Sequence, residues 1–231
     1  LEQINMPLKS GHPVGVGLFG GTFDPIHIGH LRIALEIKQE LHLKEMRMIP
    51  CARPPHRSMP LASPGDRLAM LDLALSEQSD EGLIADNLEY RRAGPSYTLD
   101  TISEIRTQIG ASTPICLCLG VDSFASIDSW VDWRDLIDIA HIVVAKRPGW
   151  GQIKNKEVVE FIQEHKAASS KEFRETPAGK IFVMELTPLS ISSTAIRKAI
   201  LHNESISYLV PETVAGYIKK NKLYQTMQDA L

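Results

Sequence analysis

The sequence is short of cysteine, and this shortage limits the kinds of site it can build. Its three cysteines cannot all pair with one another, and no third and fourth ligand stands at a zinc-like spacing. Cys116 and Cys118 alternate inside an apolar run, where a strand would place both thiols on one face. We therefore expect buried, reduced thiols rather than a metal site.

The chain also lacks long apolar runs. None reaches the roughly 18 residues of a membrane span, and no basic and apolar signal peptide opens the chain. We therefore expect a soluble, cytoplasmic protein without a membrane partner. No internal repeat and no low-complexity tract is present either.

Neither sign of charge dominates. The 28 acidic and 25 basic residues give a formal net charge of -3, and there is no strongly basic block. A large footprint on duplex nucleic acid is therefore not expected, and any bound polyanion should be small. With 43% hydrophobic and 23% charged residues, the chain fits a globular protein with a core, and collagen-like, disordered and coiled-coil classes are excluded.

Segments of strand character alternate with segments of helical character. The stripe Ala34, Ile37 and Leu41 predicts a helix after the first strand, and Leu68 is expected on the buried side of the next helix. The predicted strands are 14–19, 46–49, 83–88, 114–119, 141–145 and 181–186, and later helices are 98–109, 192–201 and 211–220. This order predicts an α/β fold with a doubly wound, mainly parallel sheet and helices on both faces.

The same pattern predicts the domain organisation. Residues 1–13 are polar and aperiodic, so we interpret them as a flexible leader. Residues 14–231 are interpreted as a single domain, because the alternation of strands and helices continues through them. Residues 149–179 are charged and only weakly apolar, which indicates an insertion on that domain rather than a second core.

The densest chemical signal lies in residues 20–30, at the end of the first predicted strand. Gly20 and Gly21 let the backbone approach a ligand closely, and the following helix start presents N–H groups and a positive dipole end. His27 and His30 are three apart, so both can donate to phosphate oxygens from one helix face. No G-x-G-x-x-G pattern of a hydride cofactor is present. The turn therefore predicts a phosphate site, with structural histidines as the alternative.

The four residues from His27 to His30 read His-Ile-Gly-His, which resembles the signature of the HIGH-motif nucleotidyltransferases. The longer run from Gly20 to His30 is similar to that of one branch, the bacterial nicotinate-nucleotide adenylyltransferases. This resemblance implies a Rossmann-like sheet and transfer of a nucleotidyl group from a triphosphate. It also implies that the ATP phosphates are bound by Gly20, Gly21, Thr22 and Phe23.

Two arginines lie in segments that resemble loops of this family. Residues 54–57 read Pro-Pro-His-Arg and are similar to the family's Pro-Pro-His-Lys, so the resemblance places Arg57 at the departing phosphates. Both side chains carry charge, although the planar guanidinium holds a bidentate geometry that an ammonium does not. A solvated surface arginine is the alternative. Residues 146–149 also resemble the family and would place Arg147 near the nucleotide.

Residues 94–98 resemble the family's pyridine-ring recognition segment. The resemblance implies that nicotinate is bound by Ser96, Tyr97 and Thr98. Hydroxyl and backbone N–H groups at a helix start can bind a carboxylate, which distinguishes nicotinate from nicotinamide. From the residues alone, the preferred interpretation is that Ser96 or Thr98 is simply an N-cap.

Residues 119–123 and a tryptophan that follows them match the family as well. Asp122 comes directly after a strand, so it is placed to contact ribose or a metal at the carboxyl edge of the sheet. The resemblance implies that Trp130 stacks on the pyridine ring, although Val131 follows it where an aromatic residue is common. Trp133 is the competing stacking residue, and on a helix it is equally a core residue.

Residues 191–197 are similar to the family's Ile-Ser-Ser-Thr-x-Ile-Arg. Ser193 and Thr194 lie four and three residues before Arg197, so hydroxyls and guanidinium gather beside a helix start. We interpret this as a second phosphate cradle. A serine cap with an exposed arginine is the alternative.

The resemblance implies an adenylyltransferase that joins ATP and nicotinate mononucleotide to give nicotinate adenine dinucleotide and pyrophosphate. Mg²⁺ is expected as the cofactor, bound through the ATP phosphates rather than by an assigned side chain. The residues expected to act on the reacting phosphates are His27, His30, Arg57 and Arg197. A pantetheine-phosphate adenylyltransferase and a non-catalytic nucleotide sensor are the alternatives, and a homo-oligomer is left open.

Overall fold

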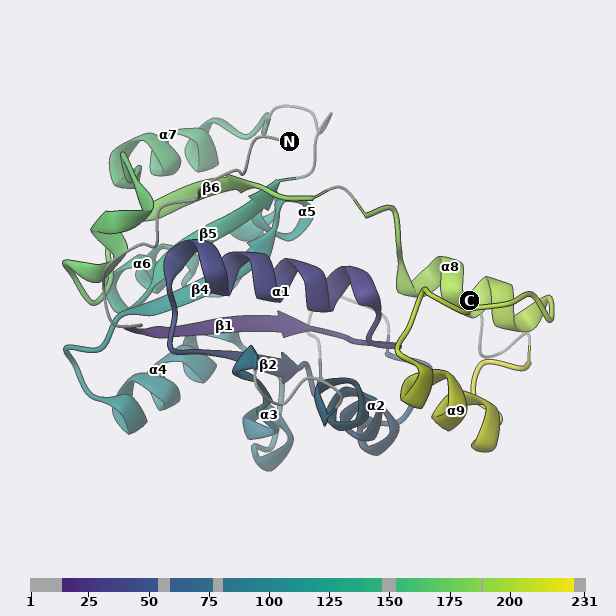
Figure 1. The fold of residues 1–231 in the computed structure, drawn as a ribbon. Helices are drawn as coiled ribbons and strands as arrows, with labels where there is room; N and C mark the ends of the chain where they lie inside the picture. The colour runs from purple at the N-terminus through teal and green to yellow at the C-terminus, as the bar shows by residue number, and fades with distance from the viewer. Residues whose placement is uncertain (1–13, 54–58, 77–80, 147–152, 188, 227–231) are drawn as a thin grey trace, which may run out of the picture.

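The computed structural model describes residues 14–53, 59–76, 81–146, 153–187 and 189–226. Within these ranges, one parallel sheet of six strands has the order β3-β2-β1-β4-β5-β6 (Figure 1). The strands are β1 (Val16–Gly21), β2 (Glu45–Pro50), β3 (Leu83–Ala85), β4 (Ile115–Gly120), β5 (His141–Lys146) and β6 (Ile181–Glu185). The strand order reverses direction between β1 and β4, which is where such sheets bind ligands beyond the carboxyl ends of their strands.

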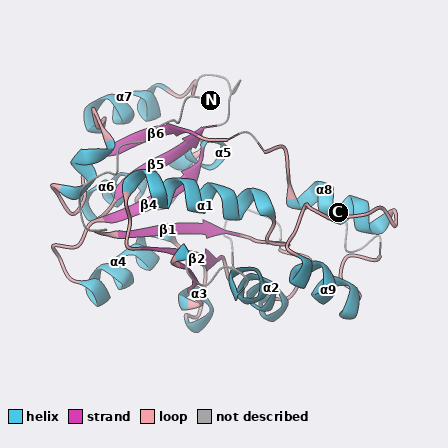
Figure 2. Cartoon of the chain, viewed as in Figure 1, coloured by secondary structure: helices cyan, strands magenta, loops and turns pink. Residues whose placement is uncertain are grey.

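Helices cover both faces of this sheet, as Figure 2 shows. The longer ones are α1 (Ile28–Leu41), α2 (Pro64–Ser76), α4 (Thr98–Ile109), α7 (Lys156–His165), α8 (Ser193–Leu201) and α9 (Glu212–Lys220). The short ones are α3 (Leu88–Arg91), α5 (Val121–Phe124), α6 (Leu136–Ile139), and the 3-10 turns η2 (Ile127–Ser129), η3 (Trp133–Asp135) and η4 (Ser170–Arg174). The predicted doubly wound, mainly parallel α/β fold is confirmed. In the described part of the chain, no helix combines the length and apolar character that crossing a bilayer requires.

The alternation of side chains along each strand sorts the core into two layers. In β4, Cys116 and Cys118 pack in the cluster that contains Ile37 of α1, whereas Leu117 and Leu119 pack in the cluster on the opposite face. Both thiols are free and fully buried. Burial raises the pKa of both, to about 12 for Cys118. The prediction of buried, reduced thiols is confirmed.

The third strand is shorter than the sequence predicts. β3 ends at Ala85, and the Asp86 carboxylate accepts a hydrogen bond from the Leu88 backbone N–H at 3.0 Å. This side-chain turn stops the strand and leads into α3. The predicted strand 83–88 is therefore wrong in its second half.

The buried side of α2 also differs from the prediction. Arg67 is fully buried, whereas Leu68 is only partly buried. The Arg67 guanidinium donates to the carbonyl oxygens of Thr22, at 2.8 Å, and Cys51, at 2.7 Å. Since charged donors on buried carbonyls form strong hydrogen bonds, this contact ties the turn after β1 to the end of β2.

The charged segment before β6 forms the connection between β5 and β6. Its helix α7 buries Val158 and Phe161 in one core layer, and η4 buries Phe173 in the other. Residues 149–152 of the predicted insertion, and the predicted leader 1–13, lie outside the described residues. The division of the chain into leader, domain and insertion stays a prediction.

Candidate active site

A pocket of about 950 Å³ opens where β1, β2 and β4 end. Gly20 and Gly120 line it at the ends of β1 and β4, where neither has a side chain to fill the space. The pocket lies at the reversal of strand order, as expected for this kind of sheet. The predicted site residues that line it are Gly20, Gly21, Thr22, Phe23, His30, Ser96, Tyr97, Thr98, Trp130, Ser193, Thr194 and Arg197.

The turn after β1 is so tightly packed that it needs glycine at two positions. A Cβ atom on Gly21 would lie 2.5 Å from the Phe23 ring, and one on Gly29 would lie 3.0 Å from Nδ1 of His27. Phe23 itself has a φ of 48°, in the left-handed region that reverses the chain direction. The two glycines therefore leave room for the ring of Phe23, which lines the pocket, and for that of His27 behind it.

The two histidines of the turn have different positions. His27 is 3% exposed and is the N-cap of α1, where its Nδ1 accepts a hydrogen bond from the His30 backbone N–H at 3.3 Å. The imidazole of His30 stacks on that of His27, with ring centroids 3.6 Å apart. His30 lines the pocket, and His27 is not among the described residues that do so. The geometry thus gives His27 a capping role, and a direct phosphate contact stays a prediction for both rings.

Residues of the predicted second phosphate cradle join helix α8 to the turn after β1 by hydrogen bonds. The Ser193 hydroxyl donates to the carbonyl oxygen of Pro25 at 3.0 Å, and Nη1 of Arg197 donates to that of Asp24 at 2.7 Å. Nη2 of Arg197 lies 3.4 Å from the Thr194 hydroxyl. Ser192 caps α8, but Arg197 is partly buried and hydrogen-bonded, so the alternative of a cap beside an exposed arginine does not describe this helix.

The predicted nicotinate segment forms another wall of the pocket. Ser96 pairs with Arg53 through two hydrogen bonds, one to the Ser96 hydroxyl at 3.2 Å and one from its backbone N–H at 3.1 Å. The N-cap of α4 is Tyr97, whose side chain makes no capping bond. The alternative that Ser96 or Thr98 serves as an ordinary N-cap is therefore wrong.

The two candidate stacking residues are separated by the structure. Trp130 is partly buried and lines the pocket, with the exposed Val131 beside it. Trp133 is 9% exposed and packs edge-on against Phe161, with ring centroids 4.8 Å apart. Trp133 is therefore a core residue, and of these two candidates Trp130 is the one that a ligand in the pocket can reach.

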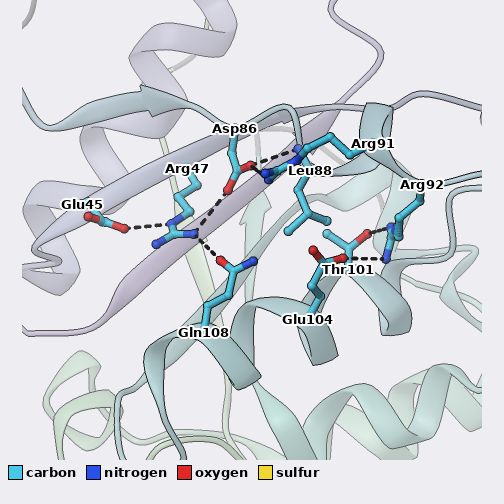
Figure 3. A network of polar contacts seen from close by, with 9 residues as sticks. All are labelled: Glu45, Arg47, Asp86, Leu88, Arg91, Arg92, Thr101, Glu104 and Gln108. Atoms are coloured by element: carbon cyan, nitrogen blue, oxygen red, sulfur yellow. Dashed lines mark hydrogen bonds and ion pairs between the residues drawn. The ribbon is translucent and has the colours of Figure 1, made fainter.

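A polar network lies behind the nicotinate segment and holds the start of α4. The Glu89 carboxylate accepts hydrogen bonds from the Ala52 backbone N–H at 3.2 Å and from the Thr101 hydroxyl at 3.0 Å. Arg92 also donates to Thr101, as Figure 3 shows. Glu89 and Thr101 are both buried and line the pocket, so this network ties the loop after β2 to the first turn of α4.

A second polar network in Figure 3 lies further along the sheet edge. Arg47 donates to Glu45 at 2.8 Å, to Asp86 at 3.2 Å and to Gln108 at 3.4 Å. It joins β2 and the turn after β3 to α4. Together, the two networks fix α4 and so the position of the predicted nicotinate segment.

Comparisons with known proteins show which family the chain belongs to. The cytidylyltransferase-like family model matches residues 18–199. A protein of Marinomonas sp., named as a probable nicotinate-nucleotide adenylyltransferase, is 41% identical over 95% of this chain and 100% of its own length. One of Cellvibrio japonicus with the same name is 45% identical, over 91% and 98% respectively.

The chain belongs to the nicotinate-nucleotide adenylyltransferase family. Solved structures agree with the fold: the Plasmodium falciparum nicotinic acid mononucleotide adenylyltransferase complexed with NaAD has a TM-score of 0.70. It is 18% identical, with coverage of 90% of this chain and 96% of that one. The recognition made from residues 20–30 is thereby confirmed.

Of the residues predicted for this member of the nicotinate-nucleotide adenylyltransferase family, four are not among the described residues that line the main pocket: His27, Asp122, Arg57 and Arg147. Asp122, exposed on α5, lines a small adjoining cavity of about 50 Å³ that shares Gly120 with it. Arg57 and Arg147 lie outside the described residues, so their predicted roles remain predictions.

Several buried polar residues at or beside this pocket were given no role from the sequence. Asp24, Glu89 and Thr101 line the pocket, and Arg67 contacts two residues that line it, Thr22 and Cys51. Asp24 stands inside the glycine-rich run and offered a signal, whereas Glu89 sits on a four-residue helix that the apolar period could not indicate. Cys51 lines the pocket too, but burial and the nearby Glu89 raise its pKa to about 12, so it is a neutral thiol rather than a nucleophile.

Proposed function

We propose that this protein transfers the adenylyl group of ATP to nicotinate mononucleotide, forming nicotinate adenine dinucleotide and pyrophosphate. The observation that carries this is that two chemically different groups of residues line one pocket. The glycine turn, His30 and Arg197 form one group, here called the phosphate end, and residues 96–98 with Trp130 form the other, here called the pyridine end. The first suits phosphates and the second suits a flat ring that bears a carboxylate.

The nucleophile is the phosphate of the mononucleotide. Its second pKa is about 6, so it is largely a dianion at neutral pH and needs no protein base. One of its oxygens forms a bond to the α-phosphorus of ATP while the bond from that phosphorus to the bridging oxygen breaks. Pyrophosphate leaves with the electron pair, and the adenylyl group ends on the mononucleotide phosphate.

The protein contributes alignment and positive potential at the reacting phosphates. The helix starts of α1 and α8 meet at this turn, because Ser193 and Arg197 are hydrogen-bonded to Pro25 and Asp24. His30, Thr194 and Arg197 line the pocket and can donate hydrogen bonds to the phosphates. Removing one preorganised donor of this kind typically lowers the rate by about 100-fold to 1000-fold.

Mg²⁺ fits this site as an ion held through the triphosphate. In the described ranges, no group of three His, Cys, Asp or Glu residues could hold a metal ion. The Asp24 carboxylate already accepts three hydrogen bonds, which leaves it poorly suited as a ligand. Because Mg²⁺ is commonly bound by substrate phosphates and waters, it would supply charge neutralisation there.

The pyridine end accounts for the choice of the acid over the amide. α4 has 12 residues and begins at Thr98, so its first N–H groups and dipole favour a carboxylate at the pocket wall. Trp130 offers a ring face to stack on the pyridine. A neutral carboxamide would turn an N–H donor toward the same donors.

The test is pyrophosphate release with ATP, Mg²⁺ and nicotinate mononucleotide, together with chromatographic identification of the dinucleotide. We expect release that depends on all three components and is much slower with nicotinamide mononucleotide. Release with 4′-phosphopantetheine instead would favour the pantetheine-phosphate adenylyltransferase. Binding of ATP without release under any of these conditions would identify a nucleotide sensor.

We also propose a cytoplasmic location. The three cysteines of the chain are free thiols in the structure, which suits a reducing compartment where ATP is available. Fractionation with thiol labelling would test this, since a disulfide-linked or exported pool would contradict it. The homo-oligomer stays a prediction, to be checked by sedimentation.

A further inference from the structure

Asp24 lines the pocket, and its carboxylate accepts hydrogen bonds from three separate groups. Oδ2 accepts from the Leu61 backbone N–H at 2.8 Å, and Oδ1 from the Ala62 backbone N–H at 3.1 Å. The third donor is the Tyr224 hydroxyl, 2.7 Å from Oδ1 and 200 residues away in sequence. With only 4% of Asp24 exposed, each donor matters to how this charge is held.

Tyr224 is built into this position. It is 2% exposed and sits in the turn that follows α9, with a φ of 63°. Burial, followed by the neighbouring Asp24 charge, raises the pKa of its hydroxyl above the ordinary tyrosine range. The hydroxyl therefore keeps its proton at neutral pH and donates it to Asp24 in the hydrogen bond.

Asp24 links parts of the pocket that are distant in sequence. The residue lines the pocket itself, and so does Leu61, whose N–H it binds. Its carbonyl oxygen accepts the 2.7 Å hydrogen bond from Arg197 of α8. Three residues further along the same turn, His27 caps α1 and supports the ring of His30. A displacement of Asp24 would therefore move both Arg197 and His30.

We propose that Tyr224 is a positioning residue of the active site, whose hydroxyl holds the Asp24 carboxylate where it joins the turn before His27 to the pocket wall at Leu61. This inference rests on the proposed function, because its readout is the adenylyl transfer. Tyr224 touches no substrate and acts through Asp24. The C-terminal turn thereby controls chemistry at the opposite end of the sequence.

The decisive variant is Tyr224→Phe, which removes one oxygen atom and one hydrogen bond. Because a misplacement of about 1 Å can cost about 100-fold in rate, we expect kcat to fall by at least about 10-fold. The described hydrogen bonds of the Asp24 side chain go to Leu61, Ala62 and Tyr224, and none goes to residues 96–98 or Trp130, so KM for the mononucleotide should change by less than about threefold.

The chain offers a matched control in Tyr217→Phe. The Tyr217 hydroxyl also donates to an aspartate, at 2.9 Å from Oδ1 of Asp66, and it also comes from the α9 region. Neither residue is among the described residues that line the pocket. The control loses the same kind of hydrogen bond, and we expect its kcat to stay within about twofold of the unmodified protein.

Both variants are assayed for dinucleotide formation and for thermal unfolding, beside the unmodified protein. A fall in kcat for Tyr224→Phe that Tyr217→Phe does not share supports the inference, and equal kcat in the two variants overturns it. If the unmodified protein forms no dinucleotide, the proposed function fails and the inference fails with it. Loss of kcat only in proportion to loss of folded protein would also overturn it, as a purely structural role.

A second pair of variants covers the case in which Tyr224→Phe does not fold. Incorporation of 4-aminophenylalanine at position 224 keeps the ring and a para donor, whereas 4-methylphenylalanine fills a similar volume without donating. We expect near-normal kcat for the amino variant and a low kcat for the methyl variant. The same kcat in both would show that donation to Asp24 does not matter.

Discussion

Polar side chains at the two ends of the sheet differ in what they face. At the amino end, the Arg106 guanidinium donates to four carbonyl oxygens, those of Gly110, Thr113, Ile139 and Pro177. There His141 uses both ring nitrogens, with Nε2 2.8 Å from the Thr176 carbonyl oxygen and Nδ1 accepting the Lys180 N–H at 3.2 Å. At the carboxyl end, donors and hydroxyls line an open pocket of about 950 Å³.

This difference indicates a division of roles between the ends. Groups at the amino end bind other parts of the protein, so their loss should lower stability and leave the chemistry intact. Donors such as His30 and Arg197 face a space that a ligand can fill, so their loss should lower the rate more than the stability. Variants at the two ends of the sheet should therefore differ in whether they lower the rate or the stability.

The largest effect is expected for His30→Ala. We expect kcat to fall by about 100-fold to 1000-fold with a much smaller change in substrate binding, because the imidazole acts on charge that grows in the transition state. Steady-state kinetics and thermal unfolding would be measured together. His202→Ala is the control, since His202 is exposed at the end of α8 and should leave kcat unchanged. An unchanged kcat for His30→Ala would remove this ring from the mechanism.

Sequence patterns predicted the parts of this molecule that local spacing determines. Strand and helix periods placed the sheet, and the run from Gly20 to His30 located the turn at the pocket. Contacts between distant residues were not predictable in this way. Leu68 was expected on the buried side of α2, yet the neighbouring Arg67 is the fully buried residue, because carbonyl groups 45 and 16 residues away accept its hydrogen bonds.

The same reasoning applies to the candidate site. The spacing of Ser193, Thr194 and Arg197 correctly gathered them at a helix start beside the pocket, but it could not show that Arg197 binds the Asp24 carbonyl oxygen. Tyr224 gave no signal at all, because its partner is 200 residues earlier. Sequence spacing predicts which nearby residues gather at the site. The hydrogen-bond partners that hold these residues in place come from distant parts of the chain, so only the folded structure shows them.

The second effect concerns selectivity at the pyridine end. We expect kcat/KM for nicotinate mononucleotide to exceed that for nicotinamide mononucleotide by at least about 100-fold, because a mispaired buried donor and a lost charge-assisted bond both disfavour the amide. Trp130→Ala should weaken the binding of both mononucleotides and leave the ratio of their kcat/KM values nearly unchanged. Thr98→Val should shrink the ratio. Comparable values for the two mononucleotides would contradict acid selectivity.

The third effect belongs to the amino end and is one of stability. Arg106→Ala leaves four carbonyl oxygens without their charged donor, and we expect a loss of about 2–3 kcal/mol in the free energy of unfolding. Its kcat should stay close to normal. The control is Arg91→Ala, since the Arg91 side chain is 62% exposed and its ion pair with Asp86 spans 3.7 Å. Equal stability of the two variants in urea would refute the division between the ends.

The smallest effect is a pH dependence of stability that comes from His141. Burial lowers the pKa of its imidazole, and the charges of Arg106 and Lys180 add to the shift. The unfolded chain therefore takes up this proton first as the pH falls below the ordinary histidine value of about 6.5. The contribution of neutral His141 to the free energy of unfolding is fully present above that value. It declines as the pH falls from there toward the lowered pKa of the folded protein, because a protonated Nδ1 would face the Lys180 N–H.

His141→Asn tests this, because asparagine can keep an acceptor for the Lys180 N–H but cannot be protonated. We expect the variant to be less stable at pH 7.5 and to lose less stability than the unmodified protein between pH 7.5 and 5.0. Urea unfolding at the two pH values measures both quantities, and other titrating groups contribute equally to the two proteins. The same loss in both would mean that His141 is not the residue that links acidity to unfolding at the amino end.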